Sequence, residues 1–361
     1  MARNIQLEEE ETSISSRPHP HEREEYIYEA PWGIAAINWS VRPDHPFRLG
    51  ICSELVNQDE TYVEILKLDR NRDNYVSDGK LSIQDLRHPS KIMFVPDRSC
   101  QMKDLFATSG TCLRVWHIQR EKIEDKVEAE NIFQTPDPDC GPITCLDWNE
   151  LQPSWIGTGS TDRTCTIWDI ERSERISQII AHENEVADIA WGAAQVYASI
   201  SNDGSFRVVD LRDMDGPITN KLWKRDESSF GHVAWNKNIS YYIAISSKSS
   251  VLILDTRAVR NPILDLWKQP EQNVNAIAWA PHLERSLCSA GDDRQASIWE
   301  IQADYEKQLP AKLLYNANTE IAQLQWSSCQ PDWVAVAYST KLSENAALTN
   351  NLLTIFKVPS L

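Results

Sequence analysis

The chain has 361 residues, a formal net charge of −17 and a hydrophobic fraction of 41%, which is enough to fill a sizeable core. Direct nucleic-acid binding requires a basic footprint and adhesion to anionic lipid requires a polybasic segment, so this acidic composition disfavours both. No apolar run is long enough to insert into a membrane, and the first residues, including Glu8–Glu11, do not resemble a secretory signal. We therefore expect a cytoplasmic and nuclear protein.

The first segment of the chain, residues 1–24, is polar and acidic and is expected to form a disordered arm. It contains the tract His19-Pro20-His21, which is too little for a metal site. Residues 25–361 are expected to form one domain that begins with a short strand at Tyr26–Ala30.

A motif of an aliphatic residue, any residue and tryptophan then recurs six times, and Ile92-Met93-Phe94 is a seventh copy with another aromatic residue. The intervals between the seven aromatic residues are 55, 54, 43, 44, 44 and 47 residues. Such a period is typical of a β-propeller, in which each repeat is one small sheet. The sequence therefore predicts an all-β, seven-bladed propeller. The tryptophans are Trp39, Trp148, Trp191, Trp235, Trp279 and Trp326.

The third repeat shows the pattern of one blade most clearly. Alternating residues predict strands at 143–148, 155–160, 165–169 and 175–180, with a turn at 161–163. Gly157–Asp162 followed by Ile167-Trp168-Asp169 resembles a WD repeat. In that family a turn aspartate, a strand hydroxyl and a tryptophan indole join a histidine in a buried network, as buried polar groups require.

The resemblance assigns structural roles to Thr158, Asp162 and Trp168 in the third repeat, where Asp139 replaces the histidine. No repeat keeps all four residues, and the fifth has Lys248 in place of the aspartate. We expect these positions to be scaffold ties, Asp203 with His182 included, rather than acid–base pairs. The fourth repeat supplies His182, Ser199 and Asp203, with Val209 in place of tryptophan, and the sixth supplies Ser289, Asp293 and Trp299.

Long polar connections interrupt several repeats. Ser53–Thr61 and Thr340–Asn350 separate the second and third strands of the first and seventh repeats, so both are expected on one face at one seam. Asp69–Lys80 and Gln119–Glu130 are expected to be long connections on the opposite face. Loops on a rigid scaffold often carry recognition, although drift at tolerant positions explains such insertions equally well.

Closing the ring requires a fourth strand for the last repeat, because the sequence stops soon after the strand at 352–358. Tyr26–Ala30 is the spare strand, and pairing it with the last repeat removes an exposed sheet edge. The eight cysteines include no C-x-x-C pair. We expect reduced thiols, with Cys112, Cys145, Cys165 and Cys288 inside repeat strands.

The sequence offers no convincing active site. His182–Glu185 lacks the second histidine of a zinc-binding H-E-x-x-H, and neither a nucleophile elbow nor a phosphate-binding loop is present. We therefore expect no enzymatic activity, no cofactor and no metal; an enzyme with dispersed catalytic residues is a distant third hypothesis.

Several longer segments resemble one group of WD-repeat proteins, the Transparent Testa Glabra or anthocyanin-regulator family of plants and its animal relatives, which include DDB- and cullin-four-associated factors and a nematode branch. The similarity extends from about residue 26 to the end. It rests on 28–32 with 37–40, 91–97, 104–110 with 113–116, 164–171, 180–182, 277–282 and 330–333.

The resemblance implies a non-catalytic adaptor in signalling and developmental regulation. Its implied partners are dual-specificity tyrosine-regulated or homeodomain-interacting kinases, basic helix-loop-helix or Myb factors, Rac pathway proteins, and the adaptor of cullin-four ligases. The alternative is a substrate receptor of a cullin-four ubiquitin ligase. Asp210-Leu-Arg212 and Asp255-Thr-Arg257 match the D-x-R part of that class's W-D-x-R motif, with Val209 and Leu254 in place of tryptophan. The competing interpretation is a surface ion pair.

Overall fold

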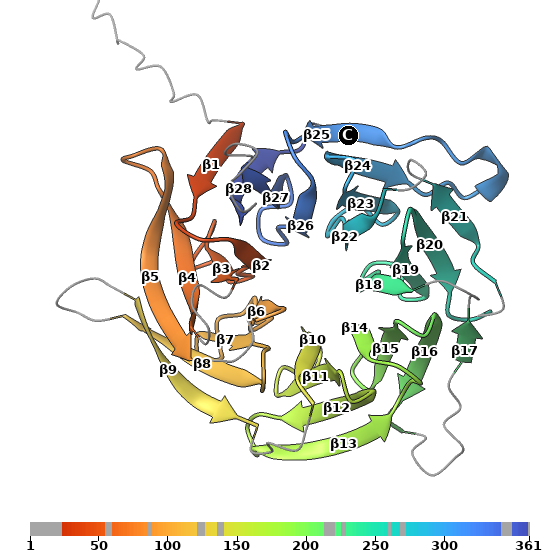
Figure 1. The fold of residues 1–361 in the computed structure, drawn as a ribbon, viewed down its shortest axis with the longest axis horizontal. Helices are drawn as coiled ribbons and strands as arrows, with labels where there is room; N and C mark the ends of the chain where they lie inside the picture. Colours follow the sequence, from red (N-terminus) through yellow and green to blue (C-terminus); the bar gives the residue numbers. More distant parts are fainter. Residues whose placement is uncertain are drawn as a thin grey trace, which may run out of the picture.

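The computed structural model forms a ring of seven four-stranded antiparallel sheets (Figure 1), and residues of the innermost strands line a central channel. It describes residues 24–54, 60–84, 89–120, 127–135, 141–212, 221–224, 229–258, 261–267, 272–340 and 349–359. The proposed N-terminal arm, including His19 and His21, lies outside these residues except for Glu24. The prediction of an all-β, seven-bladed propeller is confirmed.

Within each blade we name the strands A to D from the channel to the rim. Every predicted aromatic residue lies in an A strand. The strands of the first four blades, in the order A to D, are β2 (Ile34–Trp39), β3 (Leu49–Ser53), β4 (Glu60–Asp69) and β5 (Asn74–Gln84); β6 (Ile92–Phe94), β7 (Leu105–Thr108), β8 (Arg114–Arg120) and β9 (Val127–Gln134); β10 (Ile143–Trp148), β11 (Trp155–Ser160), β12 (Thr164–Asp169) and β13 (Glu174–Ile180); β14 (Val186–Ala193), β15 (Val196–Ser201), β16 (Ser205–Asp210) and β17 (Lys221–Lys224).

The remaining three blades repeat this order, and blade 6 also contains a short 3-10 helix, η1 (Tyr305–Lys307). Among the described residues, no helix has the length and apolar character needed to cross a bilayer. The strands are β18 (Phe230–Trp235), β19 (Tyr242–Ser247), β20 (Ser250–Asp255) and β21 (Leu264–Trp267); β22 (Val274–Trp279), β23 (Ser286–Gly291), β24 (Gln295–Glu300) and β25 (Lys312–Asn316); β26 (Ile321–Trp326), β27 (Trp333–Thr340), β28 (Thr349–Lys357) and β1 (Glu25–Glu29).

The ring is closed by its first strand, which is the D strand of the last blade. β1 pairs with β28 in antiparallel register, with Tyr26 opposite Ile355, and Figure 1 shows the two ends of the colour range side by side. The Tyr26 ring is buried and packs 5.5 Å from the ring of Trp333. The predicted closure by Tyr26–Ala30 is therefore confirmed, with the strand shifted by one residue.

The cores lie between blades, because each sheet covers the next. Phe94 and Phe106 of blade 2, for example, pack against Cys52 and Val63 of blade 1. The A-strand tryptophans add hydrogen bonds of two kinds, and each kind satisfies a buried indole N–H. Trp39, Trp191 and Trp279 donate to an A-strand carbonyl of the preceding blade; Trp148, Trp235 and Trp326 donate to the A–B turn of their own blade.

The alternating strand directions define two faces. The A–B face carries the A–B and C–D connections, and the B–C face carries the B–C connections and the links between blades. The insertions expected at 53–61 and 340–350 belong to the B–C face of neighbouring blades 1 and 7, but residues 55–59 and 341–348 lie outside the described part of the chain.

The prediction of long connections on the A–B face is wrong, because strands extend into both segments. β4 and β5 continue to a turn at 70–73, so most of Asp69–Lys80 is strand. Tyr75 is buried on this hairpin, with its ring 5.8 Å from the ring of Tyr26 in blade 7. Strand also extends to Arg120 and resumes at Val127 within Gln119–Glu130.

The cysteine predictions hold in part. Cys145, Cys165 and Cys288 are buried in strands, and burial raises the pKa of the Cys165 thiol to about 12. Cys112 is also buried, but it precedes β8 in a bend rather than lying in a strand.

Candidate functional site

Tryptophan–hydroxyl pairs tie the middle strands of three blades together. The Trp168 indole donates to Thr158 Oγ1 at 3.0 Å in blade 3, and Trp299 donates to Ser289 Oγ at 2.9 Å in blade 6. Both expected bonds are present. Blade 2 has the same tie from Trp116 to Thr108 Oγ1 at 3.0 Å, which the sequence analysis missed. The spacing there is eight residues rather than ten, so a search at constant spacing overlooks it.

The turn aspartates do not reach these indoles. Asp162 instead accepts from the Thr164 amide at 2.9 Å, and Asp203 and Asp293 accept in the same way from residues 205 and 295. They cap B–C turns whose next residue has a positive φ, 74° at both Arg163 and Gly204. Asp139 lies outside the described residues. At Lys248, where the fifth repeat lacks the aspartate, φ is also positive, at 43°.

His182 is the centre of a buried polar cluster in blade 4. Its Nε2 lies 2.8 Å from Ser199 Oγ, its Nδ1 lies 2.6 Å from Ser205 Oγ, and Asp203 Oδ1 is 3.9 Å away. Burial lowers the pKa of His182 below its usual value, so the ring is neutral at physiological pH. The structure thus brings His182, Ser199 and Asp203 together away from solvent.

The two D-x-R segments occupy equivalent places on adjacent blades. Asp210 and Asp255 end the C strands β16 and β20, and the arginine two residues later turns back onto each carboxylate. The Arg212 guanidinium makes bonds of 2.5 and 2.8 Å to Asp210. Arg257 makes bonds of 2.6 and 3.0 Å to Asp255 and covers the Tyr241 ring at 3.6 Å.

Both arginine side chains remain open to solvent, with 67% and 64% of their surface exposed. The hydrogen bonds from Arg212 hold the pKa of Asp210 below its usual value. Because C strands end on the A–B face, the two arginines project from the same face of neighbouring blades. Arg172 of blade 3 is a near equivalent, three residues after Asp169 and 3.8 Å from it.

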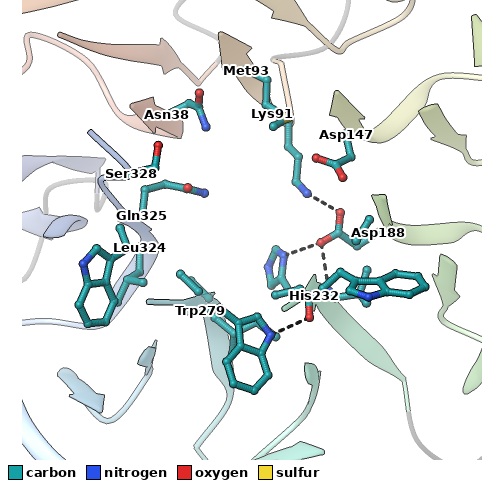
Figure 2. Close-up of a pocket in the computed structure, with 18 of the residues that line it drawn as sticks. Asn38, Lys91, Met93, Asp147, Asp188, His232, Trp279, Leu324, Gln325 and Ser328 are labelled. Atoms are coloured by element: carbon teal, nitrogen blue, oxygen red, sulfur yellow. Dashed lines mark hydrogen bonds and ion pairs between the residues drawn. The ribbon is translucent and has the colours of Figure 1, made fainter. Parts of the chain in front are cut away.

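A cavity of about 290 Å³ occupies the central channel and reaches the A–B turns (Figure 2). Two positions of the repeat supply most of its polar walls, one and three residues before the A-strand aromatic residue. The first set is Asn38, Met93, Asp147, Ala190, Ala234, Ala278 and Gln325; the second is Ala36, Lys91, Asp188, His232, Ala276 and Gln323. Neither set was singled out in the sequence, although alignment on the aromatic residues would have exposed both.

An ionic network crosses the channel wall from blade 2 to blade 5. Asp188 forms an ion pair with Lys91 and accepts from the Val233 amide at 3.2 Å, and His232 Nδ1 lies 3.5 Å from the same carboxylate (Figure 2). Burial acts to raise the pKa of Asp188, but the charge of Lys91 and the hydrogen bond from His232 outweigh it and hold the pKa at about 2. Both charges of the pair are therefore compensated within the protein.

Asp147 has a different environment. Its Oδ2 accepts from the Trp191 amide of the next blade at 2.6 Å, and Figure 2 shows the carboxylate facing the cavity. Burial raises the pKa of Asp147 to about 6, although Lys237 and Lys91 act against the rise. The protein thus keeps a poorly compensated carboxylate at the channel wall.

Comparison with known proteins identifies the family. The WD domain, G-beta repeat profile matches residues 132–169, which end with the C strand of blade 3. The DDB1- and CUL4-associated factor 7 homolog of Dictyostelium discoideum is 36% identical over 325 residues, covering 88% of this chain and 97% of the relative. The chain belongs to the DDB1- and CUL4-associated factor 7 family.

More distant relatives share parts of the ring. An uncharacterized WD repeat-containing protein of Schizosaccharomyces pombe is 27% identical over 76% of this chain and 69% of its own length. The histone acetyltransferase type B subunit 2 of Debaryomyces hansenii is 23% identical over 52% of this chain and 51% of its own length. Both similarities extend well beyond the single repeat that the profile matches.

No group of three or more metal-ligating side chains occurs in the described part of this family member. The polar residues described above fall into three groups: buried ties within blades, exposed Asp–Arg pairs on the A–B face, and the channel wall. The second and third groups face solvent or a cavity and are the candidate interaction sites.

Proposed function

We propose that this protein is a non-catalytic adaptor that binds other proteins through the faces of its propeller. The observation that carries the proposal is the closed ring of a DDB1- and CUL4-associated factor 7 family member, in which buried side chains are used for packing and ties while one face presents charged pairs and a channel mouth. A rigid ring suits this role because it holds several loop surfaces in constant positions.

The partner classes follow from the resemblance to the Transparent Testa Glabra family. They are dual-specificity tyrosine-regulated or homeodomain-interacting kinases, basic helix-loop-helix or Myb transcription factors, and Rac pathway proteins. The cytoplasm and the nucleus are accordingly the proposed locations of the adaptor. The net charge of −17 supports partners with basic surfaces.

The second candidate function is a substrate receptor of a cullin-four ubiquitin ligase. It is supported by Arg212 and Arg257, which occupy equivalent exposed positions on one face, and by the similarity to the Dictyostelium DDB1- and CUL4-associated factor 7 homolog. Arginine presents a fork of donors that recognises carbonyl and carboxylate groups on a partner. The missing tryptophans are replaced by buried Val209 and Leu254, which keep the strand packed.

Affinity purification and mass spectrometry from the native cell would test both functions. The Arg212→Glu, Arg257→Glu double variant should lose the ligase adaptor and keep kinases or transcription factors that use other surfaces. Arg172→Glu, a charge reversal on the same face with different spacing, is the matched control. Undiminished capture of the ligase adaptor by a folded double variant would exclude this docking mode, and an absence of any protein partner of the parent protein would count against the adaptor itself.

A further inference from the structure

The cavity in the central channel has one charged group that the protein leaves available. Lys91 is compensated by Asp188, and Lys237 donates to the Trp191 carbonyl at 2.7 Å and lies 3.9 Å from Glu150. Arg98 also lines the cavity, but it is exposed, and solvent therefore screens its charge. An anionic ligand would therefore meet two cations that already have partners and one whose charge solvent screens.

Asp147, in contrast, is a carboxylate that forms no ion pair among the described residues. The hydrogen bond from the Trp191 amide occupies one carboxylate oxygen, and no other hydrogen bond to this carboxylate exists within the described residues. Folding has already removed the Asp147 carboxylate from bulk water, as the raised pKa of Asp147 indicates. A cation that arrives beside it gains the Coulomb attraction without the additional cost of that desolvation.

The rest of the cavity suits a long side chain with a charged end. Met93 and Leu324 give apolar surface, and Asn38 and Gln325 provide amide groups on the wall opposite Asp188 (Figure 2). The Trp279 ring is fixed because its indole donates to the Ala234 carbonyl at 2.9 Å. Aliphatic stems of lysine and arginine pack on such surfaces, and their charged groups interact favourably with aromatic rings.

We propose that the channel mouth on the A–B face receives a lysine or arginine side chain of a protein partner, with Asp147 as its charge partner. The inference rests on the proposed adaptor function and gives that function a specific pocket. The net charge of −17 attracts basic segments toward the molecule, and the cavity then selects one side chain.

The test uses the full chain labelled at tryptophan with ¹⁵N, with the Trp279 indole signal assigned from a Trp279→Phe variant. The probes are N-acetyl-lysine methylamide and N-acetyl-arginine methylamide, with the norleucine and glutamate analogues as neutral and acidic controls. Saturable shifts of the Trp279 signal are expected with a basic probe, at least fivefold weaker affinity for norleucine, and no binding of the glutamate analogue.

Asp147→Asn should weaken binding of the basic probe at least tenfold. The amide retains an oxygen that can accept from Trp191, so the fold should persist. Glu171→Gln is the control, because it removes one exposed negative charge from the same blade. Unchanged affinity in folded Asp147→Asn, equal binding of norleucine, or preferential binding of glutamate would overturn the proposal.

Repeating the partner purification with Asp147→Asn distinguishes the proposed pocket from the proposed adaptor function. Probe binding by the parent protein with selective loss of a partner from the variant supports the pocket. Failure of the probes to bind while partners are still recovered rejects the pocket alone. Probe binding without any protein partner rejects the adaptor function and leaves only a cation site.

Discussion

Breaking the Lys91–Asp188 ion pair should destabilise the whole ring, because the pair links blades 2 and 4 across the channel wall. The Asp188 side chain is only 2% exposed, and that of Lys91 is 28% exposed. Removing one partner of a fully buried pair costs about 3–5 kcal/mol. Solvent screens part of the Lys91 charge, so we expect about 2–3 kcal/mol for Asp188→Asn.

Lys91→Met should cost less, about 1–2 kcal/mol, because Asp188 keeps its hydrogen bonds from backbone amides. In the double variant neither charge remains unpaired. Its loss should therefore fall short of the sum of the single losses by about 1–2 kcal/mol. Urea unfolding of the four proteins at pH 7.5 measures this coupling, and Lys307→Met, which removes an exposed pair with Asp304, should leave stability unchanged.

The pH dependence gives a second test of the same pair. The pKa of Asp188 is about 2 in the folded protein, below its usual value of 3.8. A depressed carboxyl pKa contributes stability above the unfolded value and loses it as the pH falls through the folded value. The gap between parent and Asp188→Asn should thus be constant from neutral pH to near 4 and close towards pH 2. Zero coupling, or a gap that persists at pH 2, would refute the reasoning.

Three further predictions concern closure, packing and the channel carboxylate. Deleting residues 1–30 should lower the melting temperature of the whole protein, whereas deleting 1–20 should not, and equal melting temperatures would contradict closure by β1. Trp168→Ala should cost about 3–5 kcal/mol, since it removes a buried aromatic side chain; a soluble variant with normal melting would show that blade 3 does not depend on this packing. Asp147 has a raised pKa of about 6 in the folded protein, above its usual value of 3.8, so its ionisation opposes folding. Asp147→Asn should be more stable than the parent at pH 7.5, by on the order of 1–3 kcal/mol, and this gap should close as the pH falls from about 6 to about 4. Equal urea midpoints at pH 7.5 would contradict this account of Asp147.

The number and order of the strands could be predicted because the aromatic residue recurs at one structural position, the end of the A strand. That regularity survives variation elsewhere, since each aromatic side chain packs between blades. Strand lengths at the rim could not be predicted in the same way. Asp69–Lys80 is polar enough to suggest a loop, but Tyr75 within it is buried against Tyr26, which is close only after the ring closes.

The scaffold ties were partly predictable for a related reason. Thr158–Trp168 and Ser289–Trp299 share a spacing that the WD pattern fixes, whereas the shorter connection of blade 2 shifts Thr108 and conceals its bond to Trp116. The bond requires that the hydroxyl and the indole lie on the same side of the paired B and C strands. Sequence spacing identifies such a pair only when the turn between the two strands has a constant length.

The channel wall shows what the repeat determines and what it leaves to individual residues. Lys91, Asp188 and His232 each lie three residues before the A-strand aromatic residue, so the repeat places them at one level of the ring. Which of them pair depends on the blade between. Blade 3 has buried Cys145 at this position, a small side chain that turns into the core, and Lys91 therefore reaches Asp188 two blades away. Asp147, one residue before its aromatic, lies outside that pairing and keeps its charge for a partner. The repeated backbone thus determines where the wall side chains lie. The residue type, which differs from blade to blade, determines the charge that a ligand meets.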